Sequence, residues 1–202
     1  MPPSPSPASL GANPVAARLL PATRFFSLLC GWWLLGYSAL VCADLVARRY
    51  FGVSLQGTDE IGGYTLAGLV AFGFAHTLLV RRHTRIDLFL SHLGALPRAV
   101  AHVVAAVAIA AFAVFAASRG WAEMAESIEF MSVSTSPLQV PLWIPQGVWF
   151  AGLAVFGVVA TLLALHALFL LARFRLRQIN AWYGPPTVDE EIAAETGRGA
   201  AR

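Results

Sequence analysis

The feature that most constrains this chain is a run of twenty residues without formal charge, at positions 61–80. Asp59 and Glu60 stand before the run, and Arg81 and Arg82 follow it. An α-helix rises about 1.5 Å per residue, so a helix of this length spans the roughly 30 Å hydrocarbon core of a bilayer. The run therefore predicts a membrane crossing with charged residues at both of its ends.

Three other apolar stretches repeat this pattern. We predict an all-α membrane protein whose four transmembrane helices cover residues 25–48, 60–80, 98–118 and 143–172. The chain is 57% hydrophobic and only 12% charged, with a mean hydropathy of +0.66, which excludes an ordinary soluble domain and a disordered chain. The helices form one predicted domain at 22–177, and the tails at 1–21 and 178–202 are predicted to be disordered in the cytoplasm.

The distribution of arginine sets the predicted orientation. Every basic residue is an arginine, and near the predicted spans nine arginines lie on one side of the membrane against three on the other. The three are Arg48, Arg49 and Arg119. Because basic residues favour the cytoplasmic side, both termini and the loop between the second and third spans are predicted to be cytoplasmic. The arginines end apolar runs and form no patch with aromatic residues, so no nucleic-acid partner is predicted.

The loop between the second and third spans carries an amphipathic pattern. After Thr84, the apolar residues Ile86, Phe89, Leu90 and Leu93 follow a helical stripe. This pattern predicts a short cytoplasmic helix that lies in the membrane interface. Membrane lipids and a second membrane protein are both candidate partners of this segment.

The third span is predicted to continue as a helix into the periplasm beyond residue 118. Glu123, Glu126 and Glu129 share one face of this extension. The acidic stripe is either a solvated surface or a contact for a soluble partner outside the cytoplasm.

Few residues in the spans suggest chemistry. The chain has no phosphate-binding loop and no zinc-protease motif, and Cys30 and Cys42 on one helix can form no disulfide with each other. We therefore predict no enzyme, no catalytic residue, no metal and no other cofactor. The alternative function is a haem-binding electron-transfer subunit, because His76, His102 and His166 fall in the cytoplasmic half of three different spans. Histidines that hydrogen-bond within the bundle are the simpler interpretation.

Asp44 is the one acidic residue near a predicted membrane core. It stands four residues before Arg48, a spacing that allows an ion pair on a helix surface. A role in ion coupling is the second interpretation, and the sequence leaves both open.

The spans do not predict a self-sufficient transporter, because they are mostly unbroken and almost without polar residues at the membrane midplane. The second span instead offers small residues for close helix packing. These are Gly62, Gly63, Gly68 and Gly73.

Three segments carry a family resemblance. They are the acidic pair at 59–60, the sequence RRHTRIDLF at 81–89, and the sequence STSPLQVPLWIP at 134–145, which is the most specific of the three. Together they resemble the small membrane subunit of the tripartite ATP-independent periplasmic (TRAP) transporters, the DctQ-like family. The resemblance covers about residues 25–172.

The resemblance implies a function that the residues alone leave open. It implies a scaffold subunit of the bacterial inner membrane that holds no substrate site. Its implied partners are a large DctM-like permease subunit and a periplasmic solute-binding protein, and the complex imports organic acids such as C4-dicarboxylates by symport with an ion. The candidate residues at the interface with the large subunit or with lipids are Glu60, Arg81, Arg82, Arg85 and Asp87. The candidates that face the binding protein are Glu123, Glu126, Glu129 and Trp143.

Overall fold

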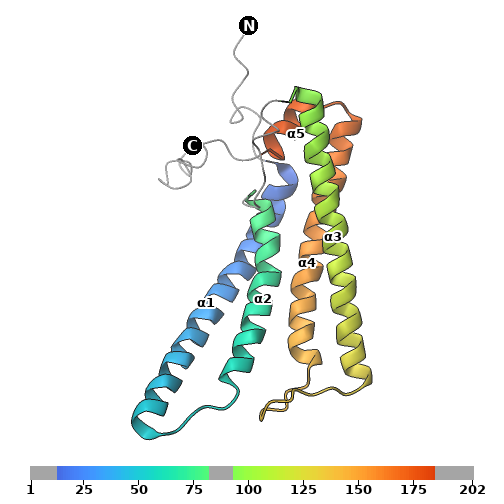
Figure 1. Cartoon of the computed structure of the whole chain (residues 1–202). Helices are drawn as coiled ribbons and strands as arrows, with labels where there is room; N and C mark the ends of the chain where they lie inside the picture. The colour runs from blue at the N-terminus through green and yellow to red at the C-terminus, as the bar shows by residue number, and fades with distance from the viewer. Residues whose placement is uncertain (1–12, 82–92, 185–202) are drawn as a thin grey trace.

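The fold consists of helices joined by short connections. The computed structural model describes residues 13–81 and 93–184, and these ranges contain no β-strand beyond an isolated bridge between Val133 and Pro141. Four of its helices are long and apolar enough to cross a membrane, which confirms the four-span prediction. The helices are α1 (Pro14–Phe51), α2 (Thr58–Leu79), α3 (Ala95–Glu129), α4 (Trp143–Ala172) and α5 (Leu176–Trp182) (Figure 1).

Helix α1 begins well before the predicted span. The side chain of Asn13 accepts hydrogen bonds from the backbone N–H groups of Val15 and Ala16, at 3.0 and 3.5 Å, and Pro14 occupies the first turn. Asn and Pro suit these two positions, because the cap satisfies free N–H groups and proline has none to satisfy. Residues 14–21, expected in the N-terminal tail, are therefore helical.

The other boundaries also refine the prediction. Helix α3 runs unbroken to Glu129, so the third span does continue well beyond residue 118. Helix α5 is a short element that the sequence did not predict, since residues from 178 onward were assigned to a tail. The predicted interfacial helix falls almost entirely on residues 82–92, outside the described ranges.

The four long helices pack in the order α1, α2, α4, α3. Helix α3 packs most extensively along α4, α4 also contacts α2, and α2 contacts α1, whereas within the described ranges α2 and α3 do not touch. Figure 1 shows the α1–α2 pair leaning away from α3 and α4 toward one end of the molecule. We call this end, where residues 130–142 join α3 to α4, the loop end, and the opposite end the α5 end. Helix α1 is the most exposed, with none of its apolar window buried.

Small residues allow the helices of this row to pack closely. Ala99, Ala106, Ala110 and Ala113 of α3 belong to one buried cluster with apolar residues of α4. At the α2–α4 crossing, a Cβ added to Gly152 would lie 2.6 Å from the Cβ of Ala71 and 3.0 Å from its carbonyl carbon. Only glycine allows this approach, because backbone atoms cannot move aside as a flexible side chain can.

Candidate interaction surfaces at the two ends of the helix row

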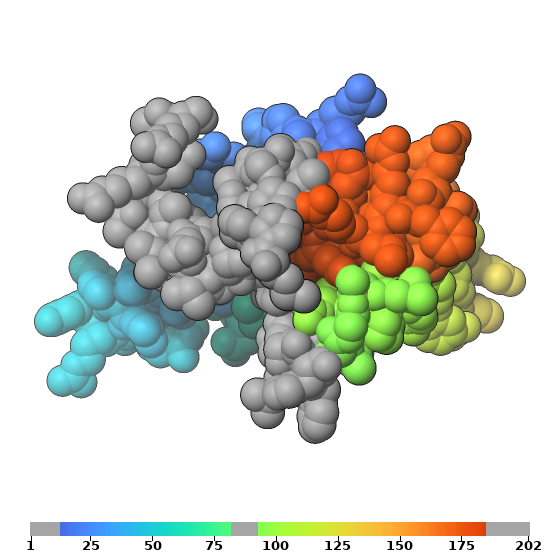
Figure 2. All heavy atoms as spheres, turned by 90° about the horizontal axis from the view of Figure 1, so that it is seen from above, coloured from blue at the N-terminus to red at the C-terminus, as the bar shows by residue number. Residues whose placement is uncertain are grey.

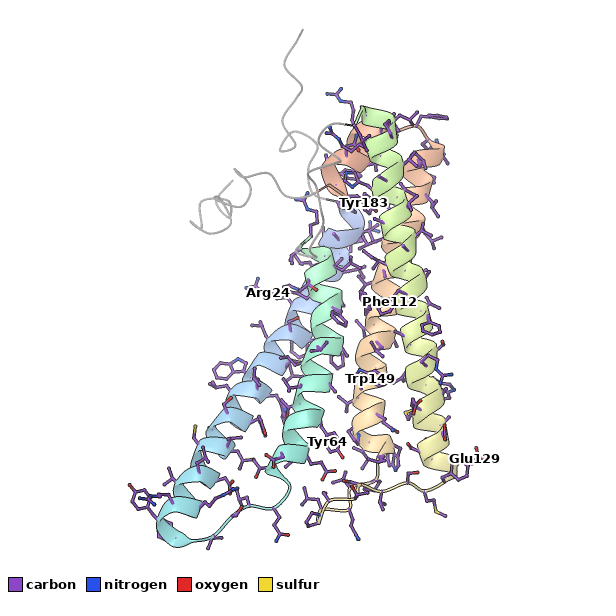
Figure 3. All side chains as sticks on the ribbon, in the orientation of Figure 1. Arg24, Tyr64, Phe112, Glu129, Trp149 and Tyr183 are labelled. Atoms are coloured by element: carbon purple, nitrogen blue, oxygen red, sulfur yellow. The ribbon has the colours of Figure 1, made fainter. Side chains whose placement is uncertain are left out.

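At the loop end, Glu60 ties the start of α2 to the connection between α3 and α4. Its carboxylate accepts hydrogen bonds from the hydroxyl of Tyr64, one turn along α2, and from the hydroxyl of Ser136. The Ser134 side chain also interacts with it. Leu138 of the same connection packs on Gly57, since its Cδ1 lies 2.0 Å from where a Cβ of Gly57 would stand. Glu60, predicted at an interface with another subunit, thus contacts its own chain. Figure 3 labels Tyr64 near this end of α2.

The connection itself has a defined conformation. The backbone N–H of Ser134 donates to the carbonyl of Val140 at 2.9 Å, and that of Leu142 donates to the carbonyl of Ser132 at 3.0 Å. The Ser136 hydroxyl, which donates to Glu60, also accepts from the backbone N–H of Leu138 at 3.2 Å. The STSPLQVP sequence therefore folds into a compact loop whose serine hydroxyls serve both the loop and α2.

The predicted binding-protein residues lie at the same end. Glu123, Glu126 and Glu129 are exposed on α3, and Figure 3 labels Glu129 at the end of that helix. Glu123 forms a solvent-exposed ion pair of 3.8 Å with Arg119. Trp143 is 47% exposed at the start of α4. The three glutamates are thus open to a partner, whereas Glu60 is occupied by its own loop.

Asp44 is buried near the loop end of α1. Its Oδ2 accepts a hydrogen bond of 2.8 Å from Arg48, so the predicted ion pair forms. Its Oδ1 accepts a shorter bond, 2.6 Å, from the backbone N–H of Leu55, which the sequence did not predict because Leu55 lies beyond the end of α1. Asp44 therefore anchors the connection between α1 and α2. Within the described ranges, no group of three or more His, Cys, Asp or Glu residues could hold a metal ion.

At the α5 end, Arg81 holds the C-terminal part of the described chain. Its Nη1 donates to the carbonyl oxygens of Ala181 and Gly184, at 3.0 and 3.4 Å. A cation is favourable here because the last carbonyls of a helix lack partners within it. The other three predicted interface residues of this region, Arg82, Arg85 and Asp87, lie outside the described ranges.

Tyr183 joins α5 to the histidine of α4. Its hydroxyl donates to the carbonyl of Leu163 at 3.0 Å and lies 2.8 Å from Nδ1 of His166, while the His166 ring stacks on Trp182 at 5.8 Å. Since the single hydroxyl proton goes to Leu163, we assign the other hydrogen bond to a proton on Nδ1. Burial raises the pKa of Tyr183 to about 12. Viewed from this end, Figure 2 shows α5 and the end of α4 between the starts of α1 and α3.

The three histidines of the spans lie in different surroundings. His102 is 2% exposed, His166 bonds to Tyr183, and Nδ1 of His76 is buried without a hydrogen-bond partner among residues 13–81 and 93–184. The His166 contact favours the interpretation of a histidine hydrogen-bonded within the bundle.

Residues 37–174 match the family model described as the DctQ component of tripartite ATP-independent periplasmic transporters. This segment covers the C-terminal part of α1 (residues 37–51), all of α2, α3 and α4, and the loop that Glu60 holds. The chain belongs to the DctQ family. The family is a component of a transporter and not a family of enzymes. Neither the curated proteins nor the solved structures contain a match to the chain.

The DctQ match confirms the family expected from the sequence, and with four membrane helices it makes the chain a multi-pass membrane protein of TRAP transport. Helix α5 and Tyr183 lie beyond residue 174, outside the DctQ match. Sequence reasoning missed the partners of Glu60 and the bond of Asp44 to the Leu55 backbone, although it predicted the pair with Arg48. The serines stood in the most specific motif, but no spacing rule connects them to a carboxylate 74 and 76 positions away.

Proposed function

We propose that this DctQ chain is the fixed scaffold subunit of a TRAP-type secondary transporter. It works with a large DctM-like permease subunit, which moves the substrate, and with a periplasmic solute-binding protein. The complex imports organic acids of the C4-dicarboxylate kind by symport with an ion, commonly sodium, without ATP. The main support is that Asp44 on α1, Glu60 on α2 and His166 on α4 hydrogen-bond within the chain. In addition, all four long helices are unbroken. A scaffold needs rigid helices, whereas a transport site needs broken ones with free polar groups.

The exposure of α1 supports a large partner in the membrane. Phe25 and Trp32 are 63% and 71% exposed, and the helix packs mainly on α2. Such an exposed row can extend the membrane footprint of a larger subunit while it stays fixed.

We place the α5 end in the cytoplasm and the loop end in the periplasm of a bacterial inner membrane. The arginines support this orientation, because Arg24, Arg98 and Arg173 lie toward the α5 end, whereas Arg48 and Arg119 lie toward the loop end. The exposed glutamates of α3 then face the periplasm, where the binding protein is found.

The proposed interfaces keep the residues predicted from the sequence. Arg81, Arg82, Arg85 and Asp87 meet the large subunit or its lipids at the cytoplasmic end. Glu60 lies at the other end and is bound to the loop, so an interface that includes Glu60 also includes the loop. Glu123, Glu126, Glu129 and Trp143 form the proposed surface for the binding protein.

The first experiment is gentle solubilisation of the tagged protein from its native membrane, followed by mass spectrometry of what co-purifies. A stoichiometric large polytopic permease is the expected partner. Recovery of the chain alone would overturn the proposal. Recovery with redox subunits and a Soret absorbance would also overturn it and would favour the haem-binding alternative.

Two sets of variants test the proposed interfaces separately. Arg82→Glu should reduce recovery of the large subunit, while Arg49→Glu at the opposite end serves as a charge-matched control. Replacing Glu123, Glu126 and Glu129 together by Gln should lower uptake and leave complex recovery intact. Normal uptake in the triple variant removes the binding-protein assignment.

A further inference from the structure

We propose that Glu60 is a positioning residue that fixes the α3–α4 loop, residues 130–142, across the loop end of α2. Its carboxylate interacts with three hydroxyls, those of Tyr64, Ser134 and Ser136, and the two serines belong to the loop. Hydrogen bonds to an ionised acceptor are stronger than those between neutral groups. Glu60 is thus the strongest described polar link between α2 and the loop.

The loop needs such a link because little else holds it against α2. Helices α2 and α3 do not touch within the described ranges, and the α1–α2 pair leans away from α3 and α4 toward this end (Figure 1). Besides Glu60, Tyr64 of α2 interacts with Ser134 of the loop, and Leu138 packs on Gly57, just before α2, and is still 42% exposed. Without the carboxylate, the loop keeps the contacts of Tyr64 and Leu138 but loses its charged acceptor.

Ser134 and Ser136 connect the Glu60 carboxylate to the backbone of the loop. The Ser136 hydroxyl donates to Glu60 and accepts from the N–H of Leu138, and the Ser134 hydroxyl accepts from the N–H of Ser136 at 3.2 Å. A hydroxyl whose proton is taken by an acceptor keeps its lone pairs directed at the backbone donors. Loss of the carboxylate therefore frees both the hydroxyls and the turn that they stabilise.

The loop leads directly to surfaces proposed for the binding protein. It begins after Glu129 and ends at Trp143, and its exposed apolar residues include Met131, 84% exposed, and Val133, 50% exposed. A fixed loop presents these residues in one arrangement, so less conformational entropy is lost when a partner docks. This step rests on the proposed function, whereas the link between Glu60 and the loop does not.

The first test is amide hydrogen exchange of residues 130–142 in the full chain in lipid nanodiscs. Glu60→Gln should speed exchange in this segment by about tenfold or more, as expected for loss of hydrogen bonds to a charged acceptor. Asp59→Asn is the matched control, because Asp59 is the exposed neighbour and loses the same charge. Equal exchange in the two variants overturns the proposal.

Combining the Glu60 and serine variants distinguishes the positioning role from a direct contact of Glu60 with the large subunit. Ser134→Ala with Ser136→Ala should reproduce the effect of Glu60→Gln on exchange, and the triple variant should be no worse than either. If Glu60→Gln weakens recovery of the large subunit while the serine variant does not, Glu60 acts at that interface, and the positioning role is overturned.

The functional test is reconstituted uptake of labelled succinate at increasing concentrations of the binding protein. Glu60→Gln should raise the half-saturating concentration of the binding protein several-fold and keep the maximal rate. Faster exchange without this rise confirms the link between Glu60 and the loop and overturns its effect on docking of the binding protein. Absence of uptake even in the unaltered complex and in Asp59→Asn counts against the proposed function, and the exchange measurement then still decides the link between Glu60 and the loop.

Discussion

At the scale of single residues, Asp44 depends more on a backbone partner than on its ion pair. Its bond to the Leu55 N–H is shorter than its bond to Arg48, whose side chain is 58% exposed. Exposed ion pairs contribute little, whereas a partly buried backbone donor that loses its acceptor costs more. Asp44→Ala should therefore lower the thermal unfolding midpoint in detergent by several degrees, and Arg48→Ala should lower it much less. Equal losses would make the ion pair the main contact.

Tyr183 predicts a pH dependence at the α5 end. Its pKa is raised to about 12 by burial, from an ordinary value near 10. The neutral hydroxyl is the form that the fold stabilises, so this stability is fully present below about pH 10 and is lost as the pH rises toward 12. In that window, the unfolding midpoint should fall more steeply for the unaltered protein than for Tyr183→Phe.

The control for this titration is Tyr50→Phe, because Tyr50 is 78% exposed. It should keep the steep fall of the unaltered protein between pH 10 and 12. If Tyr183→Phe and Tyr50→Phe give the same slope, the Tyr183 hydroxyl does not contribute through its buried contacts.

At the scale of elements, the crossing of α2 and α4 depends on one glycine. Gly152→Ala places a methyl group against Ala71 and its backbone, so the two helices must separate. Overpacking of this kind costs about 1–3 kcal/mol. Gly73→Ala on α2 is the matched control, because an added Cβ there meets nothing within 4 Å. Thermal unfolding in detergent should show a lower midpoint for Gly152→Ala alone, and an unchanged midpoint would contradict the close crossing.

The glycine ridge predicted on the second span is only partly a packing surface. Gly62 approaches Tyr37 of α1 and Gly68 approaches Val148 of α4, but Gly63 and Gly73 face open space. Four glycines in a sequence do not tell which of them face a neighbour. The decisive small residue, Gly152, stood in α4 among larger apolar residues and gave no such signal.

At the scale of the whole molecule, the proposed orientation can be measured directly. Cys30 and Cys42 are first replaced by Ser, and single cysteines are then introduced as Glu129→Cys and Arg177→Cys, both at exposed positions. A membrane-impermeant maleimide added to cells with a permeabilised outer membrane should label Glu129→Cys and leave Arg177→Cys unlabelled until lysis. The opposite pattern would reverse the orientation that the arginine count predicts.

The sequence by itself determined that four helices cross a membrane, roughly where they lie, and that the chain belongs to the DctQ family. The length of an apolar run and the charges at the ends of that run are local properties of the sequence, so they can be recognised without the tertiary structure. Tertiary structure alone decided the order α1, α2, α4, α3 and the partners of Glu60 and Tyr183. The reason is that lipid and protein neighbours are equally apolar, so hydrophobicity does not mark which side of a membrane helix faces another helix.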